Sequence, residues 1–206
     1  MTNELQKVAE ADFPCHFGHF RIFGFTWTPP GASEAEEAVV LKMGDLDASG
    51  DAKPPLVRIH SECLTGDVFH SLRCDCGGQL DLALEAIAAE GRGLLIYEHQ
   101  EGRGIGLLNK LRAYELQDQG ADTVEANEKL GFAADLRGYG LPAAIAKYFG
   151  LQAVRLMSNN PEKIQALEDA GVRVVERIPT IVERSSTTES YLRTKRDKMG
   201  HLLDPA

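Results

Sequence analysis

The feature that most constrains the fold is a strand–helix–strand pattern in the last third of the chain. Ala153–Met157 (AVRLM) and residues 172–177 (VRVVER) are short, apolar and rich in branched side chains, as buried strands are. Between them, Asn160 and Pro161 are typical of a helix start, and Gly171 is typical of a helix end. Two strands joined by one helix pair in parallel through a right-handed crossover. The chain is therefore predicted to be an α/β protein, with α+β as the alternative, built on a mixed β-sheet.

Further elements are predicted on the N-terminal side of this unit. Strand patterns cover Phe17–Trp27, Ala38–Met43, Leu56–Ile59 and Leu94–Tyr97, and helical patterns cover Gln79–Glu90, Leu107–Gln119 and Leu141–Phe149. The acidic stretch Met1–Phe13 carries no such pattern and does not resemble a signal peptide. The polar tail Thr188–Leu203 is helix-capable. We expect a strand-rich N-terminal part, helices that flank the sheet, and a single domain over residues 1–206.

Net charge limits the classes of partner for this chain. The formal net charge is −9, and no apolar run approaches the ~20 residues that a membrane span requires. Nucleic acids and anionic membranes attract basic proteins, so neither is expected as a partner, and we expect a cytoplasmic location. A small anion would need a local cluster of basic side chains. The candidates for such a cluster are Arg58, Arg73, Arg103, Lys110, Arg112, Arg137 and Lys163.

Three of the four cysteines have the spacing of metal ligands. Cys63, Cys74 and Cys76 lie within one short stretch, and zinc prefers thiolate ligands. Three protein ligands leave the fourth tetrahedral position of a catalytic zinc open for water. Cys15 lies far away among aromatic residues and is expected to be a small buried apolar side chain.

The fourth position of this site has two readings. In a closed structural site, His60 or His70 would be the fourth ligand. In a catalytic site the position stays open, and Glu62 and His60 are the nearest acid–base candidates in the sequence. Spacing alone leaves both readings open.

Three turns are candidate anion-binding segments. Residues 99–110 (HQEGRGIGLLNK) follow a predicted strand and open a helix, where glycines allow close backbone approach and the helix N-terminus attracts phosphate. Residues 158–163 (SNNPEK) have the same strand-to-helix position. Residues 134–140 (ADLRGYG) place an Asp and an Arg two residues apart, between glycines and a helix start. Each also has a purely structural explanation: a tight glycine turn, a helix cap or a surface ion pair.

Taken together, these segments resemble GTP cyclohydrolase II, a family of riboflavin biosynthesis. The similar segments are RIHSECLTGDVFHSLRCDCGGQL (58–80), EGRGIGLLNKLRAYELQDQGADTVEAN (101–127), LGFAADLRGYG (130–140), SNNPEK (158–163) and TKRDKMGHLL (194–203). The resemblance covers most of the chain and is weakest before Leu56. It implies a homodimeric enzyme that uses Zn²⁺ and Mg²⁺ to convert GTP to formate, diphosphate and a diaminopyrimidinone ribosyl phosphate. A non-catalytic nucleotide-binding protein and a variant that keeps the formyl group are the alternatives.

The resemblance also assigns roles to residues. It implies that Cys63, Cys74 and Cys76 bind zinc, and that Asp135, Arg137 and Tyr114 are a proton acceptor, a nucleophile and a catalytic tyrosine. The implied GTP contacts are Arg58, Ile59, His60, Ser61, Glu62, Gln79, Glu101, Gly102, Arg103, Thr123, Ser158 and Lys163. Ser158 stands where the family is expected to have Thr, and it keeps the hydroxyl group.

The sequence leaves open which residue holds the guanine and what Arg137 does at the phosphate. Arg103 and Lys163, with Mg²⁺, are expected to neutralise the triphosphate, and Glu101 or Gln79 would hold the guanine. Arg137 is either a covalent nucleophile or a charge clamp on the α-phosphate, because a guanidinium group ordinarily stays protonated.

Overall fold

A computed structural model describes residues 4–47, 53–182, 194–197 and 200–203. Its centre is a seven-stranded sheet in the order β1-β2-β3-β5-β4-β6-β7. The strands are β1 (Gln6–Cys15), β2 (Gly18–Trp27), β3 (Glu36–Met43), β4 (Leu56–Ser61), β5 (Gly93–Glu98), β6 (Ala153–Met157) and β7 (Arg173–Ile178). Strands β1, β2, β3 and β5 pair antiparallel, whereas β5, β4, β6 and β7 pair in parallel. The predicted α/β class with a mixed sheet is confirmed.

The predicted strand–helix–strand unit is present. Strands β6 and β7 pair in parallel and are joined by α6 (Pro161–Asp169). The Asn160 side chain accepts a hydrogen bond from the Glu162 amide, which caps the first turn. Gly171 has a positive φ of 82°, the left-handed conformation that ends many helices. The residue types that predicted this unit therefore have the local roles expected of them.

Strand β1 is the main element that the sequence patterns missed. The segment Met1–Phe13 showed no strand pattern, yet residues from Gln6 onward pair with β2. Seven of the first eight residues of β1 are exposed, so no alternation of apolar and polar side chains marks the strand. The reason is its place at the edge of the sheet, where neither face is fully covered.

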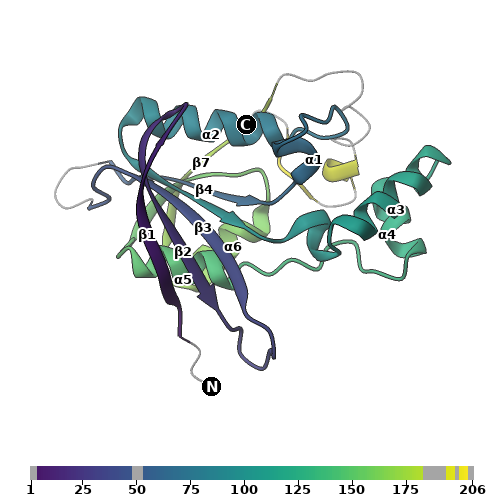
Figure 1. Ribbon diagram of the computed structural model, residues 1–206, viewed down its shortest axis with the longest axis horizontal. Coiled ribbons are helices and arrows are strands. Elements are labelled where there is room, and N and C mark those ends of the chain that lie inside the picture. Colours follow the sequence, from purple (N-terminus) through teal and green to yellow (C-terminus); the bar gives the residue numbers. More distant parts are fainter. Residues whose placement is uncertain (1–3, 48–52, 183–193, 198–199, 204–206) are drawn as a thin grey trace.

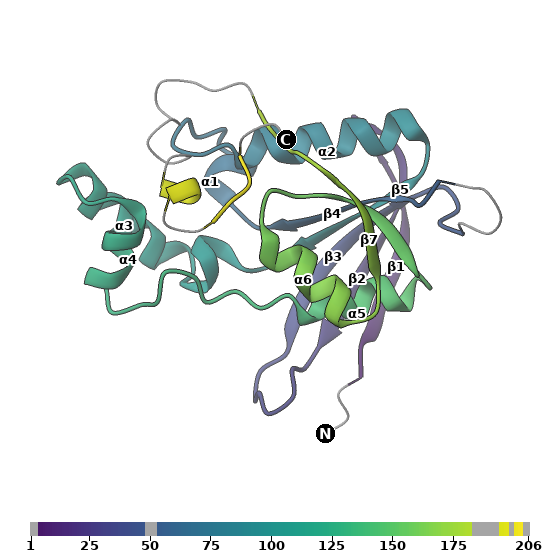
Figure 2. The same cartoon turned by 180° about the vertical axis from the view of Figure 1, so that it is seen from behind.

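Helices cover both faces of the sheet (Figures 1 and 2). On one face, α2 (Cys76–Glu90) packs over Leu56 and Leu95 in an apolar cluster that also holds Phe20. On the other face, α5 (Gly140–Tyr148) and α6 cover a larger cluster of strand residues. Helix α2 begins three residues before the predicted Gln79, so Cys76 is its first residue.

The remaining helices lie beside the sheet. The short α1 (Leu64–Asp67) follows β4, and a 3₁₀ turn, η1 (Glu101–Gly104), follows β5. Helices α3 (Leu107–Asp118) and α4 (Thr123–Lys129) extend away from the sheet, at the right of Figure 1. Among the described helices, none is long and apolar enough to cross a membrane.

The C-terminal tail is described only in part. Of the predicted helical segment Thr188–Leu203, residues 194–197 are helical and residues 200–203 are not, and the others lie outside the described residues. The Leu202 amide donates to the Asn159 carbonyl, 2.9 Å away, which joins the tail to the loop after β6. Strands β4, β5 and β6 thus end beside one another, and the tail crosses near their carboxyl ends. Ligands of open α/β sheets bind at such an edge.

Candidate active site

A cavity of about 690 Å³ lies at this edge, and it gathers most of the residues that the sequence singled out. That volume is within the usual range for a small-molecule site. The predicted residues that line it are Arg58, His60, Ser61, Glu62, Cys63, Cys74, Cys76, Gln79, Glu101, Gly102, Arg103, Tyr114, Thr123, Arg137, Ser158 and Lys163. Ile59 and Asp135 do not line the cavity. The side chain of Ile59 is buried in the larger apolar cluster, and Asp135 binds the guanidinium group of Arg137.

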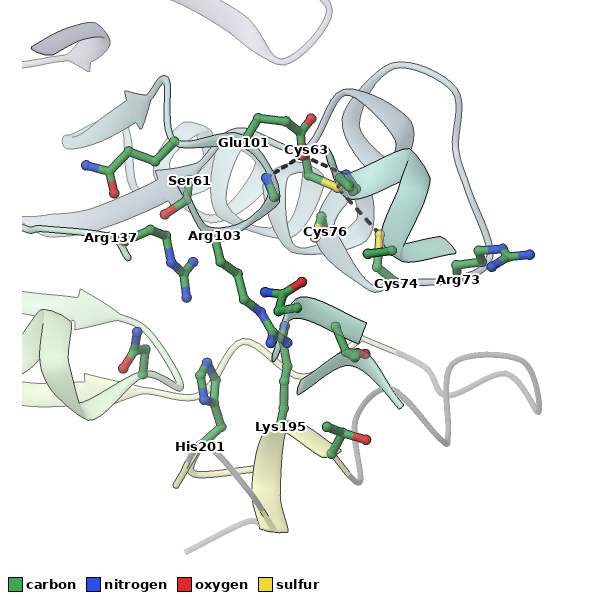
Figure 3. Close-up of a pocket in the computed structure, with 18 of the residues that line it drawn as sticks. Ser61, Cys63, Arg73, Cys74, Cys76, Glu101, Arg103, Arg137, Lys195 and His201 are labelled. Carbon is green, nitrogen blue, oxygen red and sulfur yellow. Dashed lines mark hydrogen bonds and ion pairs between the residues drawn. The ribbon is translucent and has the colours of Figure 1, made fainter. Parts of the chain in front are cut away.

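Cys63, Cys74 and Cys76 form one side of the cavity, which we call the sulfur wall (Figure 3). Their Sγ atoms all lie within 4.8 Å of one another, and those of Cys63 and Cys74 are 3.7 Å apart. This separation is far too long for a disulfide bond. It matches the roughly 3.8 Å between two sulfurs that each lie ~2.3 Å from a tetrahedral zinc ion. The donor set therefore fits zinc.

Gly66 in α1 leaves room for this cluster. A Cβ atom at Gly66 would lie 2.9 Å from the Cys74 Sγ and 3.2 Å from the Cys63 Sγ. A Cβ atom at Gly77 would lie 2.4 Å from the Gly66 carbonyl oxygen, so α1 and α2 approach each other at two glycines. Any larger residue at either position would separate the segments that carry the sulfurs.

The described residues offer the cluster no fourth His, Cys, Asp or Glu ligand. The His60 Nε2 lies 3.1 and 3.2 Å from the two carboxylate oxygens of Asp67, so the imidazole is directed to that carboxylate. His70 is exposed. Asp67 also accepts hydrogen bonds from the Cys63 amide and the Tyr97 hydroxyl, at 3.0 and 2.8 Å. Within the described part of the chain, the geometry favours three ligands and an open fourth position.

Lys110 and Tyr114 of α3 lie against the sulfur wall. The Lys110 Nζ is 3.1 Å from the Cys63 Sγ and 2.7 Å from the Glu101 Oε1. Hydrogen bonds from the other two thiols, together with the Lys110 charge, lower the pKa of Cys63, which favours the thiolate that binds metal. The Tyr114 hydroxyl is 3.2 Å from the Thr65 Oγ1, and burial raises the pKa of this phenol, so it stays protonated at neutral pH.

A row of buried polar side chains forms the floor of the cavity. Arg58 donates to the Gln79 Oε1, the Met157 carbonyl and the Thr180 Oγ1, at 2.7, 3.0 and 3.1 Å. Gln79 donates in turn to Asp75, at 2.5 Å, and the Lys195 Nζ of the tail is 3.2 Å from the same carboxylate. These contacts connect the tail to β4 through the residue that lies between Cys74 and Cys76.

Arg103 and Arg137 lie across the cavity from the sulfurs (Figure 3), and Lys163 contacts the same Tyr139 ring as Arg137. We call these three residues the cation wall. Asp135 holds Arg137 by two side-chain contacts, Nε–Oδ1 at 2.9 Å and Nη2–Oδ2 at 2.5 Å. Burial alone would raise the pKa of Asp135, but the Arg137 hydrogen bonds and charge outweigh it and lower the pKa. The pair is thus a largely buried, oriented ion pair, and the alternative of an exposed surface pair is wrong.

Arg103 projects from a strained turn. Its φ is +63°, a left-handed value that is uncommon outside glycine, and its carbonyl accepts a hydrogen bond from the Leu136 amide at 3.1 Å. This bond joins η1 to the loop that carries Arg137. The two terminal nitrogens of Arg103 are buried and have no hydrogen-bond partner among the described residues. Figure 3 shows the side chain reaching toward Lys195 and His201. Strain and unpaired donors of this kind are typical of a ligand site.

Residues of β4 hold the Lys163 ammonium group in place. Its Nζ donates to the Ile59 carbonyl at 2.9 Å and to the Ser61 Oγ at 3.2 Å, and Ser61 in turn donates to Glu98 at 3.4 Å. Burial lowers the pKa of Lys163, and burial raises the pKa of Glu98 to about 7, although the Lys163 and Arg137 charges oppose this rise. Glu98 is 0% exposed and lies below the surface of the cavity.

The structure places most of the candidate basic residues, but not Cys15, at the cavity. Six of the seven candidate basic residues line the cavity, and Arg112 does not. Cys15 is only partly buried and packs at the margin of the smaller apolar cluster, so its predicted burial is only partly correct. Sequence patterns assigned no role to Asp67 or Asp75. They also assigned none to four tail residues that line the cavity, namely Thr194, Lys195, His201 and Leu203. Only the resemblance in residues 194–203 pointed to the tail.

Comparison with known proteins agrees with this geometry. A family profile described as GTP cyclohydrolase II matches residues 6–179. A protein named GTP cyclohydrolase-2 from Shigella boydii serotype 18 is 54% identical over 98% of this chain and 99% of its own length. The protein of the same name from Yersinia pseudotuberculosis is 56% identical over 97% of this chain and 98% of its own length. That from Escherichia coli is 55% identical, with coverage of 98% and 99%.

Proposed function

This chain belongs to the GTP cyclohydrolase II family, and we propose that it opens the imidazole ring of GTP in a zinc-dependent hydrolysis. It is therefore a hydrolase of riboflavin biosynthesis. The proposed products are formate, diphosphate and a diaminopyrimidinone ribosyl phosphate. The observation that supports this reaction most strongly is the single cavity that holds the sulfur wall on one side and the cation wall on the other.

The sulfur wall is the proposed site of the carbon chemistry. Cys63, Cys74 and Cys76 would hold Zn²⁺, which when bound supplies a Lewis acid for the attack of water on guanine. Tyr114 would donate or accept a hydrogen bond at the opening ring, because its protonated hydroxyl faces the cavity beside Thr65. Glu101 and Gln79 are fixed by protein partners before substrate binds, so they are preorganised to hold the guanine.

The cation wall is the proposed site of the phosphate chemistry. Arg103 and Lys163, with Mg²⁺ carried by the nucleotide, would neutralise the triphosphate and the leaving diphosphate. Arg58, His60, Ser61, Glu62, Gly102, Thr123 and Ser158 would complete the GTP contacts, with Ile59 contributing only through its backbone.

Arg137 is proposed to act at the α-phosphate. Asp135 holds one edge of its guanidinium group, and it is the nearest base to take a proton if a bond to phosphorus forms. The covalent role predicts a trapped guanylyl adduct on Arg137 during turnover. Full activity of Arg137→Lys would exclude that role and leave the charge clamp.

The proposed function is tested by incubating the protein with GTP and measuring formate and diphosphate separately. Excess Mg²⁺ is present throughout, with and without a zinc-selective chelator. We expect both products, and we expect the chelator to abolish formate. GTP binding without formate would instead indicate a nucleotide-binding protein, and a product mass that retains the formyl group would indicate incomplete hydrolysis.

Family membership also leads us to propose a homodimer that works in the cytoplasm. Light scattering of the purified protein would test the dimer, since a mass near the 22.5 kDa of one chain would contradict it.

A further inference from the structure

The ammonium group of Lys110 occupies an unusual position between a sulfur and a carboxylate. Its Nζ is 3.1 Å from the Cys63 Sγ and 2.7 Å from the Glu101 Oε1. Only 11% of the Lys110 side chain and 9% of the Glu101 side chain are exposed. A charged group that is this buried must be compensated by partners of opposite charge.

Glu101 is itself held in place by backbone groups. The Leu64 amide donates to its Oε2 at 2.7 Å, and the Gly102 amide donates to its Oε1 at the same distance. Leu64 directly follows the zinc-ligand candidate Cys63, so the carboxylate spans from η1 to the cysteine segment. The backbone amides fix the Glu101 carboxylate, and the carboxylate in turn holds the Lys110 ammonium group within hydrogen-bond distance of the Cys63 sulfur.

Charge explains what an ammonium group at this sulfur would do. Three thiolates around a divalent ion leave one excess negative charge, and electron-rich sulfurs make zinc a weaker Lewis acid than imidazole ligands do. A hydrogen bond to a ligand sulfur withdraws electron density from it, and such partners commonly tune a metal site.

We propose that Lys110 is a positioning residue of the metal site, which donates a charged hydrogen bond to the Cys63 thiolate and neutralises the excess charge of a three-sulfur zinc centre. Glu101 holds the ammonium in place. This inference rests on the proposed zinc site and adds to it a fourth, cationic partner that does not bind the metal.

Two variants test the proposal. Lys110→Met removes the charge and both hydrogen bonds while keeping the length of the side chain, and Lys110→Arg keeps the charge. Zinc affinity is measured by competition with a chromophoric chelator. The cobalt-substituted protein gives a second reading through its sulfur-to-metal charge-transfer band. Lys129→Met is the matched control, because Lys129 lies exposed on α4 and loses the same charge.

We expect Lys110→Met to bind zinc about 10- to 100-fold more weakly, as is typical when a partner of a metal ligand is removed. Its charge-transfer band should move to longer wavelength, because the Cys63 thiolate donates electrons more readily without the hydrogen bond. Lys110→Arg should keep most of the affinity and Lys129→Met all of it.

The outcomes distinguish failure of the Lys110 role from failure of the proposed zinc site. Wild-type affinity together with an unmoved band in Lys110→Met overturns the role of Lys110. A wild-type protein that binds neither zinc nor cobalt overturns the proposed zinc site itself. Far-ultraviolet circular dichroism checks folding. If Lys110→Met is unfolded, Lys110→Gln removes the charge alone, and zinc affinity equal to the wild type in that variant would overturn the charge-neutralising role.

Discussion

The two sides of the cavity are built in opposite ways. The sulfur wall comes from one continuous segment, since Cys63, Cys74 and Cys76 lie on either side of α1 and at the start of α2. The cation wall comes from three distant turns, which follow β5, precede α5 and begin α6. A ligand set on one segment can form from local structure, whereas a set drawn from three turns exists only once the whole sheet has folded. In the proposed function the sulfur wall carries the carbon chemistry and the cation wall carries the phosphate chemistry. Variants of one wall can therefore be compared with variants of the other.

The largest effect is expected for Cys74→Ser. Loss of a zinc ligand should reduce formate production by more than about 100-fold, because even indirect changes at metal sites cost 10- to 100-fold. Diphosphate release should fall much less, since the cation wall is untouched. Both products are measured in one reaction, with the zinc content of the protein.

Cys15→Ser is the matched control for this change, because Cys15 lies outside the cavity. It should retain both products. Equal loss of formate and diphosphate in Cys74→Ser would mean that the two walls act as one unit.

Arg137→Ala should give the reverse pattern. Removal of one positioned charge at a reacting phosphate typically costs about 10²- to 10³-fold in rate, so diphosphate release should fall by that factor while zinc affinity stays unchanged. Arg112→Ala is the control, because Arg112 is exposed and does not line the cavity. A loss of bound zinc in Arg137→Ala would contradict the division.

Glu98→Gln probes the support beneath the cation wall. Burial raises the pKa of Glu98 from 4.5 to about 7, so the folded protein holds a proton that the unfolded chain releases. Wild-type stability should therefore fall as pH rises from about 4.5 to 7, relative to Glu98→Gln, by roughly 3 kcal/mol in total.

Urea unfolding of both proteins across this pH range measures the difference. The exposed Glu176→Gln serves as the control and should follow the wild-type curve. Parallel curves for the wild type and Glu98→Gln would show that the burial of this carboxyl group has no energetic consequence.

The smallest effect is expected for Gly66→Ala at the sulfur wall. The added methyl group would lie 2.9 Å from the Cys74 Sγ, so this sulfur must shift, and zinc affinity should fall about tenfold. Gly24→Ala is the matched control, since nothing lies within 4 Å of the added atom there. Competition with a chelator measures both variants, and unchanged zinc affinity in Gly66→Ala would mean that α1 can move away freely.

The two walls also differ in how far the sequence predicts them. Cysteine spacing indicates the sulfur wall directly, because three thiols within one short stretch have the residue type and spacing of zinc ligands. The convergence of the basic residues could not be derived in this way. Lys110 and Arg112 look equivalent in the sequence, yet positions two apart on a helix differ by about 200° and face opposite sides. Only the packing of α3 decides which one reaches the cavity.

Strand prediction follows the same physical rule. Strands β6 and β4 are buried on both faces and were predicted from their apolar runs. Strand β1 is exposed along most of its length, and its pairing with β2 is set by backbone hydrogen bonds that leave no trace in residue type. The resemblance to a known family supplied the roles of the site residues, and periodicity and spacing alone did not.

The attachment of the tail has a practical consequence for protein engineering. Leu203 is 6% exposed and lines the cavity, and Lys195 contacts the carboxylate between two of the cysteines. A purification tag or reporter domain fused just behind Leu203 would thus be attached directly to a residue that lines the cavity. A fusion ahead of β1 would instead start at the exposed margin of the sheet, and it is the safer design for assays, crystallisation and immobilisation.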